Sequence, residues 1–146
     1  MNNKFGYVNL AIVGTKSYND YDKFLEVIHN ILDVYSIVPG CIISGGAKGV
    51  DTLAEDYAKE FEIKPKIFPA EWTNASGIYD KGAGMKRNAL IIENADFVVA
   101  IWDGKSSGTK NSIKRAKNLN KPLVIYNYIE DKIYEFNIKH QDILEL

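Results

Sequence analysis

Ser44-Gly45-Gly46-Ala47-Lys48-Gly49-Val50-Asp51 is the stretch around which this chain is organised. The short apolar run Cys41-Ile42-Ile43 precedes it, and the helix-forming residues 52–58 follow it. This order predicts a strand, a glycine-rich turn and the start of a helix. Glycines allow positive φ and the close approach of a ligand, and successive backbone N–H groups at a helix N-terminus favour a bound anion. The alternative is a tight turn that binds nothing.

The composition is that of one globular domain over residues 1–146, with a core from about 7 to 126 and an extension over 127–146. The net charge of −1 provides no overall attraction to nucleic acid or to a membrane. A single cysteine, Cys41, cannot form an internal disulfide, and the first residues lack a leader pattern, so we expect a cytoplasmic protein. Two histidines far from this cysteine give no metal-binding pattern, and we expect neither metal nor cofactor.

Strand-like and helix-like segments alternate along the chain. The predicted strands cover residues 7–13, 41–43, 66–68, 97–102 and 123–126. Segments with helical periodicity lie between them, such as the one that carries Phe24, Ile28 and Ile31. This alternation predicts an α/β fold, a Rossmann-like three-layer sandwich with a mostly parallel central sheet. The alternating apolar residues of the C-terminal extension fit either a pair of strands or a helix.

Two segments interrupt the alternation. Pro39-Gly40 is expected to break the chain before the second strand, because proline cannot donate a hydrogen bond to a sheet. Residues 70–84 are rich in turn residues and are expected to form an irregular loop. Loops of this length in small domains often carry function.

Positive charges follow the predicted strands, at the sheet edge where α/β proteins bind their ligands. They are Lys16, Lys48, Lys81, Lys86, Arg87, Lys105 and Lys110. With the glycines and the hydroxyls of residues 106–109, they predict a phosphate site. Arg87 has the planar fork that suits bidentate contact with a phosphate. Surface cations without a ligand are the alternative.

The predicted ligand-binding residues come from several of these turns. They are Gly14, Thr15, Lys16, Ser17, Ser44, Gly45, Gly46, Lys48, Gly49, Asp51, Trp72, Arg87, Asn88, Asp103, Gly104, Ser106, Ser107, Gly108 and Thr109. A side chain at Gly46 is expected to fill the place of the anion. Asp51 either favours the helix dipole or holds a sugar hydroxyl, and backbone donors should keep it ionised. Trp72 and Tyr79 either stack on a base or cover an edge of the core.

Three of these motifs together resemble the SLOG superfamily of Rossmann-like nucleotide-ligand proteins. They are residues 44–51, Gly84-Met85-Lys86-Arg87-Asn88 and Asp103-Gly104-Lys105-Ser106-Ser107-Gly108-Thr109, and the resemblance covers roughly residues 8–126. The small stand-alone DUF2493 (YAcAr-like) branch is the most similar. The motifs also resemble the Rossmann domain of the DNA-processing protein DprA, which binds single-stranded DNA. A further similar group is the LOG phosphoribohydrolases, which cleave the N-glycosidic bond of nucleoside monophosphates.

The sequence departs from the LOG pattern at the catalytic carboxylate. LOG proteins have a proline-glycine-glycine turn and a glutamate three residues after their Gly-Thr pair, and these positions are here Asp103-Gly104 and Ser112. The LOG activity is therefore not carried over. The catalytic residue is unknown, and Asp51, Glu71 and Asp103 are the candidates if a glycosidic bond is cleaved.

The motifs and the resemblance imply a protein that binds a nucleotide or nucleotide-derived ligand, as a sensor or a sequestering module. Two alternatives stay open, an enzyme that hydrolyses the N-glycosidic bond of nucleotides and a DprA-like binder of single-stranded DNA. The expected partners are thus a nucleotide-type small molecule or a single-stranded nucleic acid, and no membrane. SLOG relatives also imply a homo-oligomer, with an apolar contact surface around Ile133, Phe136, Ile138, Ile143 and Leu144.

Overall fold

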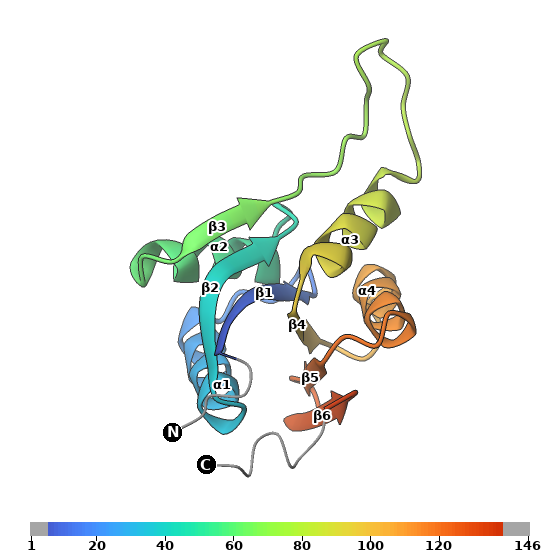
Figure 1. Ribbon diagram of the computed structural model, residues 1–146. Coiled ribbons are helices and arrows are strands. Elements are labelled where there is room, and N and C mark those ends of the chain that lie inside the picture. Colours follow the sequence, from blue (N-terminus) through green and yellow to red (C-terminus); the bar gives the residue numbers. More distant parts are fainter. Residues whose placement is uncertain (1–5, 139–146) are drawn as a thin grey trace.

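The computed structural model describes residues 6–138, which form one six-stranded sheet with four helices (Figure 1). The strands are β1 (Gly6–Gly14), β2 (Ile37–Ser44), β3 (Lys64–Ile67), β4 (Phe97–Trp102), β5 (Leu123–Asn127) and β6 (Lys132–Phe136). The helices are α1 (Tyr21–Val34), α2 (Val50–Glu60), α3 (Ala83–Asn94) and α4 (Ser107–Asn118). The strand order is β3-β2-β1-β4-β5-β6, and all neighbouring pairs are parallel except β5 with β6.

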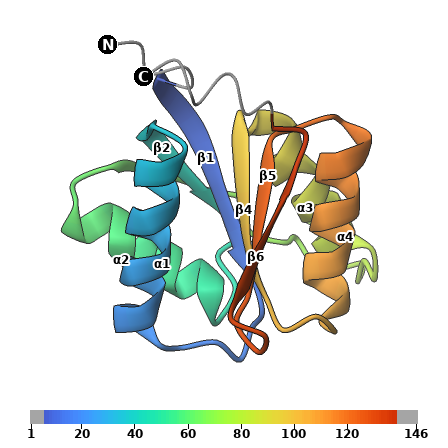
Figure 2. The same cartoon turned by 90° about the horizontal axis from the view of Figure 1, so that it is seen from below.

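The helices cover both faces of the sheet, with α1 and α2 on one side and α3 and α4 on the other (Figure 2). Strand β1 shows how the sequence supports this. Leu10 and Ile12 pack in the core cluster that contains residues of α1 and α2, while Ala11 and Val13 pack in the cluster that contains residues of α3 and α4. A strand covered on both faces needs apolar residues at every position. The predicted three-layer α/β sandwich with a mostly parallel sheet is confirmed.

Strand β2 is longer than predicted, because Pro39-Gly40 does not break the chain. The strand begins at Ile37, and Pro39 pairs with Val8 of β1. On its other side β2 pairs with β3 only over its last four residues, from Cys41 to Ser44. The register with β1 also shifts here, because Val8 pairs with Pro39 and Asn9 with Cys41, which leaves Gly40 unpaired in the ladder. Pro39 therefore lies beside an irregularity on a strand that has only one neighbour at this point, and such positions tolerate proline.

The two edge strands also differ from the prediction. Strand β3 spans Lys64–Ile67 rather than residues 66–68, and it includes Pro65, which an edge position tolerates. The C-terminal extension over residues 127–146 contains β6, which runs antiparallel to β5. Of the two alternatives for this extension, the pair of strands is therefore the one observed. Ile143 and Leu144 lie outside the described residues. The homo-oligomer stays a prediction.

Residues 70–82 form the predicted irregular loop, in which one isolated bridge pairs Thr73 with Tyr79. Figure 1 shows this segment, called the arm below, projecting from the body of the domain. Asp80 N–H donates to the Trp72 carbonyl at 2.7 Å, and Asn74 N–H donates to the Ile78 carbonyl at 3.1 Å. Gly77 makes the tip with φ +79°, a conformation that glycine adopts without strain. The arm leads directly into α3.

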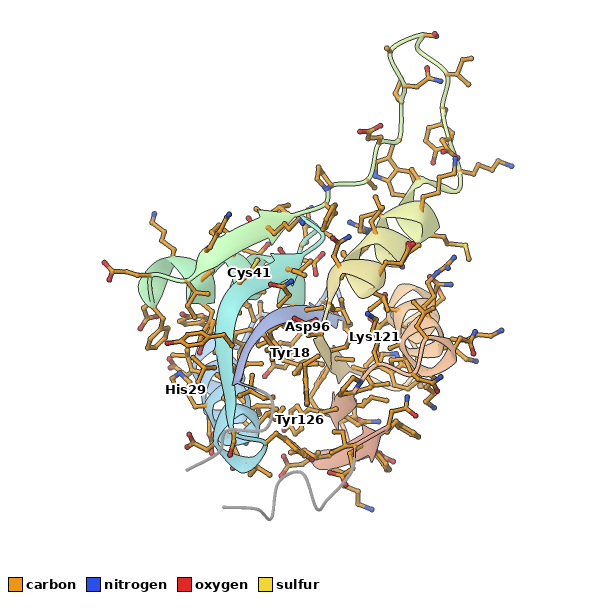
Figure 3. The ribbon with its side chains drawn as sticks, in the orientation of Figure 1. Tyr18, His29, Cys41, Asp96, Lys121 and Tyr126 are labelled. Atoms are coloured by element: carbon orange, nitrogen blue, oxygen red, sulfur yellow. The ribbon has the colours of Figure 1, made fainter. Side chains whose placement is uncertain are left out.

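The structure also bears on the expectations for the single cysteine and for the membrane. Cys41, labelled in Figure 3, is a free cysteine buried on β2, where it packs as a small apolar residue. Within residues 6–138, no helix is both long and apolar enough to cross a bilayer.

Candidate ligand-binding site

The site lies at the carboxyl ends of β1 and β4, which are neighbours at the centre of the sheet. From β1 the chain continues toward β2, and from β4 it continues toward β5 on the opposite side. The two crossovers diverge at this point and leave a crevice, which is the usual ligand position in open α/β sheets. Here it is a cavity of about 510 Å³, called the cleft below.

Most of the predicted ligand-binding residues line the cleft. They are Gly14, Thr15, Lys16, Ser17, Asp51, Trp72, Arg87, Asn88, Asp103, Ser106, Ser107, Gly108 and Thr109. Ser44, Gly45, Gly46, Lys48, Gly49 and Gly104 are not among the lining residues, and neither is the catalytic candidate Glu71. The predicted set omitted Val13, Ala47, Lys81, Gly84, Met85, Ile91 and Ser112. Gly84 and Ile91 share a helix face with Arg87 and Asn88, so helical spacing was the signal for them.

Thr15 ties together the three turns that surround the cleft. Its N–H donates to the carbonyl of Ile101 at 3.0 Å, and its carbonyl accepts the N–H of Val50 at 3.3 Å. Its hydroxyl oxygen accepts the N–H of Asp103 at 3.2 Å and lies 3.3 Å from the hydroxyl of Ser106. Thr15 is 4% exposed. Because buried polar groups need partners, this residue fixes the relative positions of the turns.

Gly49 allows the turn after β2 to approach the turn after β1. It has φ +72°, and a Cβ atom here would lie 2.4 Å from the carbonyl oxygens of both Thr15 and Lys16. Real Cβ atoms do not approach oxygen so closely, so any other residue would separate the two turns. Gly49 therefore shapes the cleft without lining it.

Asp103 caps the turn between β4 and α4. One of its carboxylate oxygens accepts the N–H of Ser106 and the N–H of Lys105, both at 2.8 Å, and the Ser106 hydroxyl at 3.0 Å. The backbone hydrogen bond from Ser106 is the main reason why the pKa of Asp103 lies below its ordinary value. The carboxylate is thus an ionised structural acceptor, which makes it a poor proton donor to a leaving group.

The N-terminus of α4 opens into the cleft. Ser106 occupies the N-cap position but makes no side-chain capping hydrogen bond, while Ser107, Gly108 and Thr109 of the first turn line the cavity. The first N–H groups of a helix have no partner within the helix. Together with the helix dipole, they favour an anion at this place.

Arg87 is held in the cleft by protein contacts on two sides. Its Nη1 donates to the Gly45 carbonyl at 2.7 Å, and its Nε donates to the Asn88 side-chain oxygen at 3.1 Å. Asn88 in turn donates to the Gly108 carbonyl and to the Asn111 side chain, both at 3.3 Å. Two of the guanidinium's five N–H donors are engaged. Within residues 6–138 the other donors have no partner, so they can meet a ligand on a side chain whose orientation is already set.

Asp51 lines the cleft together with Arg87 and is 8% exposed. Burial raises the pKa of its carboxyl. Hydrogen bonds from the backbone oppose this rise in pKa, one from the Ala47 N–H at 3.1 Å and one from Gly45. The positive charges of Arg87 and Lys16 oppose it as well. The donors predicted for Asp51 are thus present, but burial outweighs their effect on the pKa, which the sequence did not reveal. A buried carboxylate oxygen here can accept a hydrogen bond from a ligand hydroxyl.

The two glycines after β2 have different roles from those predicted. Gly46 does have positive φ, +70°, but a Cβ atom there would meet Ile67 of β3 at 3.0 Å. A side chain at Gly46 would therefore point toward β3, and the expectation that it would fill the anion's place was wrong. At Gly45 a Cβ atom would lie 2.7 Å from Arg87 Nη1 and 2.8 Å from Asp51 Oδ2. Gly45 is the glycine that leaves room for the charged groups.

Trp72 connects the arm to the cleft. Its ring stacks on that of Tyr79 with centroids 6.2 Å apart, and a Cβ atom at Gly84 would lie 3.2 Å from its Cη2. Trp72 is 42% exposed. Nearby, Asp80 accepts a hydrogen bond from Lys86 Nζ at 2.6 Å, which links the arm to α3. The indole thus lies at the mouth of the cleft with part of its surface free.

The cations predicted to gather at one edge divide into groups. Lys16, Lys81 and Arg87 line the cleft. Lys86 pairs with Asp80 on the arm, and Lys110 lines a different cavity. Lys48 and Lys105 are exposed and line neither cavity. Within residues 6–138, no group of three or more histidine, cysteine, aspartate or glutamate side chains could hold a metal ion.

No protein-family model matches the chain, and no curated protein matches it in sequence. Its fold resembles DNA processing protein A from Helicobacter pylori. The two structures share 27% sequence identity with a TM-score of 0.55, over 80% of this chain and 63% of the other. That solved structure concerns the single-stranded DNA binding mode of the Helicobacter pylori protein. The likeness confirms a DprA-like Rossmann fold, while the SLOG, DUF2493 and LOG assignments stay predictions.

Proposed function

We propose that the cleft binds a nucleotide unit through its phosphate and its sugar. The observation that carries this proposal is the position of Arg87, which is fixed by Gly45 and Asn88 in the same cavity as the uncapped N-terminus of α4. A guanidinium fork and a helix N-terminus are both strong binders of phosphate oxygens. Lys16 adds a third positive group to the cavity.

The rest of the cleft suits the other parts of a nucleotide. Asp51 offers a buried acceptor to a sugar hydroxyl, and Trp72 offers an aromatic surface to a base at the mouth. The cavity of about 510 Å³ falls within the range of small-ligand pockets. Binding without turnover, as a sensor or a sequestering module, is the function that these groups support best.

Single-stranded DNA is a second candidate source of the nucleotide unit. The observation that favours it is the likeness to DNA processing protein A, at 27% identity over 80% of this chain. A phosphate cradle with an aromatic side chain at its mouth also serves to bind nucleotides within a strand. This chain spans 63% of the length of that protein, so the comparison supports strand binding by the cleft and not the whole activity of the relative.

Calorimetric titration of AMP, dAMP, CMP and oligothymidylate into the protein tests the proposal. Arg87→Ala should weaken binding of every ligand by about 1.5–3 kcal/mol, as expected for hydrogen bonds to a charged group. Arg87→Lys should recover part of this loss, because it restores the charge without the fork. Lys64→Ala on β3 removes an exposed positive charge that does not line the cleft, and is the control. If a folded Arg87→Ala variant binds these ligands as tightly as wild type does, the cleft is not the binding site.

A further inference from the structure

A second cavity lies on the other side of α4 from the cleft. It has a volume of about 530 Å³ and lies between α4 and the β5–β6 hairpin. In Figure 1, α4 stands between α3 and this hairpin. Its apolar wall includes the rings of Trp102, Tyr134 and Phe136, and Tyr134 is 41% exposed. We call it the hairpin cavity.

Three lysines of α4 line the hairpin cavity. Lys110, Lys114 and Lys117 follow one another at intervals of four and three residues, so they share one helix face and lie roughly 6 and 4.5 Å apart along its axis. None of them has an ion-pair partner within residues 6–138, although Lys117 Nζ lies 3.8 Å from the centre of the Phe136 ring. Glu130 also lines the cavity, and its carboxylate accepts the Tyr134 hydroxyl at 2.8 Å. The cavity thus joins aromatic surface to a net positive charge.

The cleft and the hairpin cavity share a wall. Along the turn after β4, Asp103 and Ser106 line the cleft, whereas Trp102 and Gly104 line the hairpin cavity. Trp102 Nε1 donates to the Ser106 carbonyl at 3.1 Å and so fixes the indole beneath this turn. Gly104, with φ +85° and no side chain, lies in this turn on the side of the hairpin cavity. A chain-like ligand that crosses this turn would therefore meet both cavities.

We propose that a single-stranded nucleic acid crosses the turn between β4 and α4 and occupies both cavities. The inference rests on the proposed function, since one nucleotide unit sits in the cleft. Following nucleotides place their bases against Tyr134 and their phosphates along the lysines of α4. Stacking on aromatic rings and a groove of positive charge are the two features that bind single strands without regard to sequence.

The arm is a weaker candidate for the path of the strand. The Trp72 and Tyr79 rings face each other at 6.2 Å and an interplanar angle of 15°, so one face of each ring is covered. Lys86 is paired with Asp80 at 2.6 Å. Lys110 and Lys114 of the hairpin cavity, by contrast, have no ion-pair partner within residues 6–138.

Binding of dTMP and of an oligothymidylate of about twelve nucleotides, within the usual site size of such proteins, tests this path. The double variant Lys114→Ala/Lys117→Ala should bind dTMP as wild type does. Its affinity for the oligonucleotide should fall at low salt, and the slope of log K against log salt should shrink by about 0.7 per lysine removed. Tyr134→Ala should lower oligonucleotide affinity without this change in slope. Lys59→Ala/Lys64→Ala, two exposed lysines outside both cavities, is the control.

The outcomes separate this inference from the proposed function. If dTMP binds and the oligonucleotide binds no more tightly, the inference is wrong while the cleft remains a nucleotide site. An unchanged salt slope in the Lys114→Ala/Lys117→Ala variant would likewise overturn it, as would tighter binding of a duplex of equal length. If neither dTMP nor the oligonucleotide binds, the proposed function itself is wrong. A parallel titration with oligouridylate distinguishes RNA from DNA as the source of the strand.

Discussion

Arg87 Nη1 donates to the backbone carbonyl of Gly45 at 2.7 Å, which joins the start of α3 to the glycine-rich turn after β2. This hydrogen bond sets the direction of the Arg87 guanidinium. It therefore affects ligand binding even if neither the Gly45 carbonyl nor the turn contacts the ligand. The turn that organises the sequence thus acts on the cleft largely through Arg87 and Asp51.

Substitution of Gly45 tests this relationship. In Gly45→Ala the new Cβ would lie 2.7 Å from Arg87 Nη1 and 2.8 Å from Asp51 Oδ2, so both charged groups must move. We expect nucleotide affinity to fall by about 1.5–3 kcal/mol, as for loss of the guanidinium contact itself. Gly40→Ala is the matched control, since its Cβ would meet its nearest neighbour at an ordinary 3.8 Å. Wild-type affinity in Gly45→Ala would mean that Arg87 is not positioned by this turn.

Thr15 should be needed for the stability of the turns as well as for binding. Thr15→Val leaves the Asp103 N–H without its acceptor in a buried place, which costs about 1–3 kcal/mol. Thr15→Ser retains the hydroxyl and should recover most of the loss. Urea unfolding of the three proteins measures the effect. Equal stability of Thr15→Val and wild type would show that the hydroxyl contact is not structurally important.

The pH dependence of stability should report on Asp103. Its pKa is lowered in the folded protein, chiefly by the Ser106 N–H, so its ionised form stabilises the fold above the unfolded pKa of about 3.9. This contribution is lost as the pH falls through the lower, folded pKa. The difference in stability between wild type and Asp103→Asn should therefore be largest above about pH 4 and shrink below it. Asp22→Asn, on the exposed surface of α1, is the control. A difference that stays constant with pH would contradict the assignment.

The sequence was sufficient for the features that depend on local pattern. Alternation of apolar runs with helical segments predicted the layers, and the positions of the turns after β1 and β4 predicted most of the cleft. It was insufficient where a neighbour decides the outcome. Pro39 fits within β2 because β3 pairs only from Cys41 onward and the register with β1 shifts at Gly40. Whether Gly45 or Gly46 faces the charged groups depends on where α3 packs. Lys110 was assigned to the cleft, but α4 turns it toward the hairpin cavity.

Trp72 and Tyr79 should differ in their effect on nucleotide binding although their rings stack on each other. Trp72 lines the cleft and Tyr79 does not. Trp72→Ala should weaken binding of nucleotides by about 1–3 kcal/mol, the usual value for an aromatic ring that stacks on a base. Tyr79→Ala should have a smaller effect and serves as the matched control on the same arm. Titration with AMP and with the free ribose phosphate separates base contacts from phosphate contacts, and equal losses for both ligands would remove Trp72 as the base platform.

The carboxylates of the cleft favour binding over cleavage of a nucleotide. Ser112, where LOG proteins have their glutamate, lines the cleft and is 2% exposed. Asp103 is engaged in capping its turn, and Glu71 does not line the cleft. Asp51 is left, and its Oδ2 accepts the Ala47 N–H. We therefore expect incubation with AMP, dAMP, CMP and NAD-derived nucleotides to release free base, measured by chromatography, at less than about one turnover per second, the low end for enzymes. Faster release would make the protein a glycosidase, and its loss in Asp51→Asn would then identify the catalytic carboxylate.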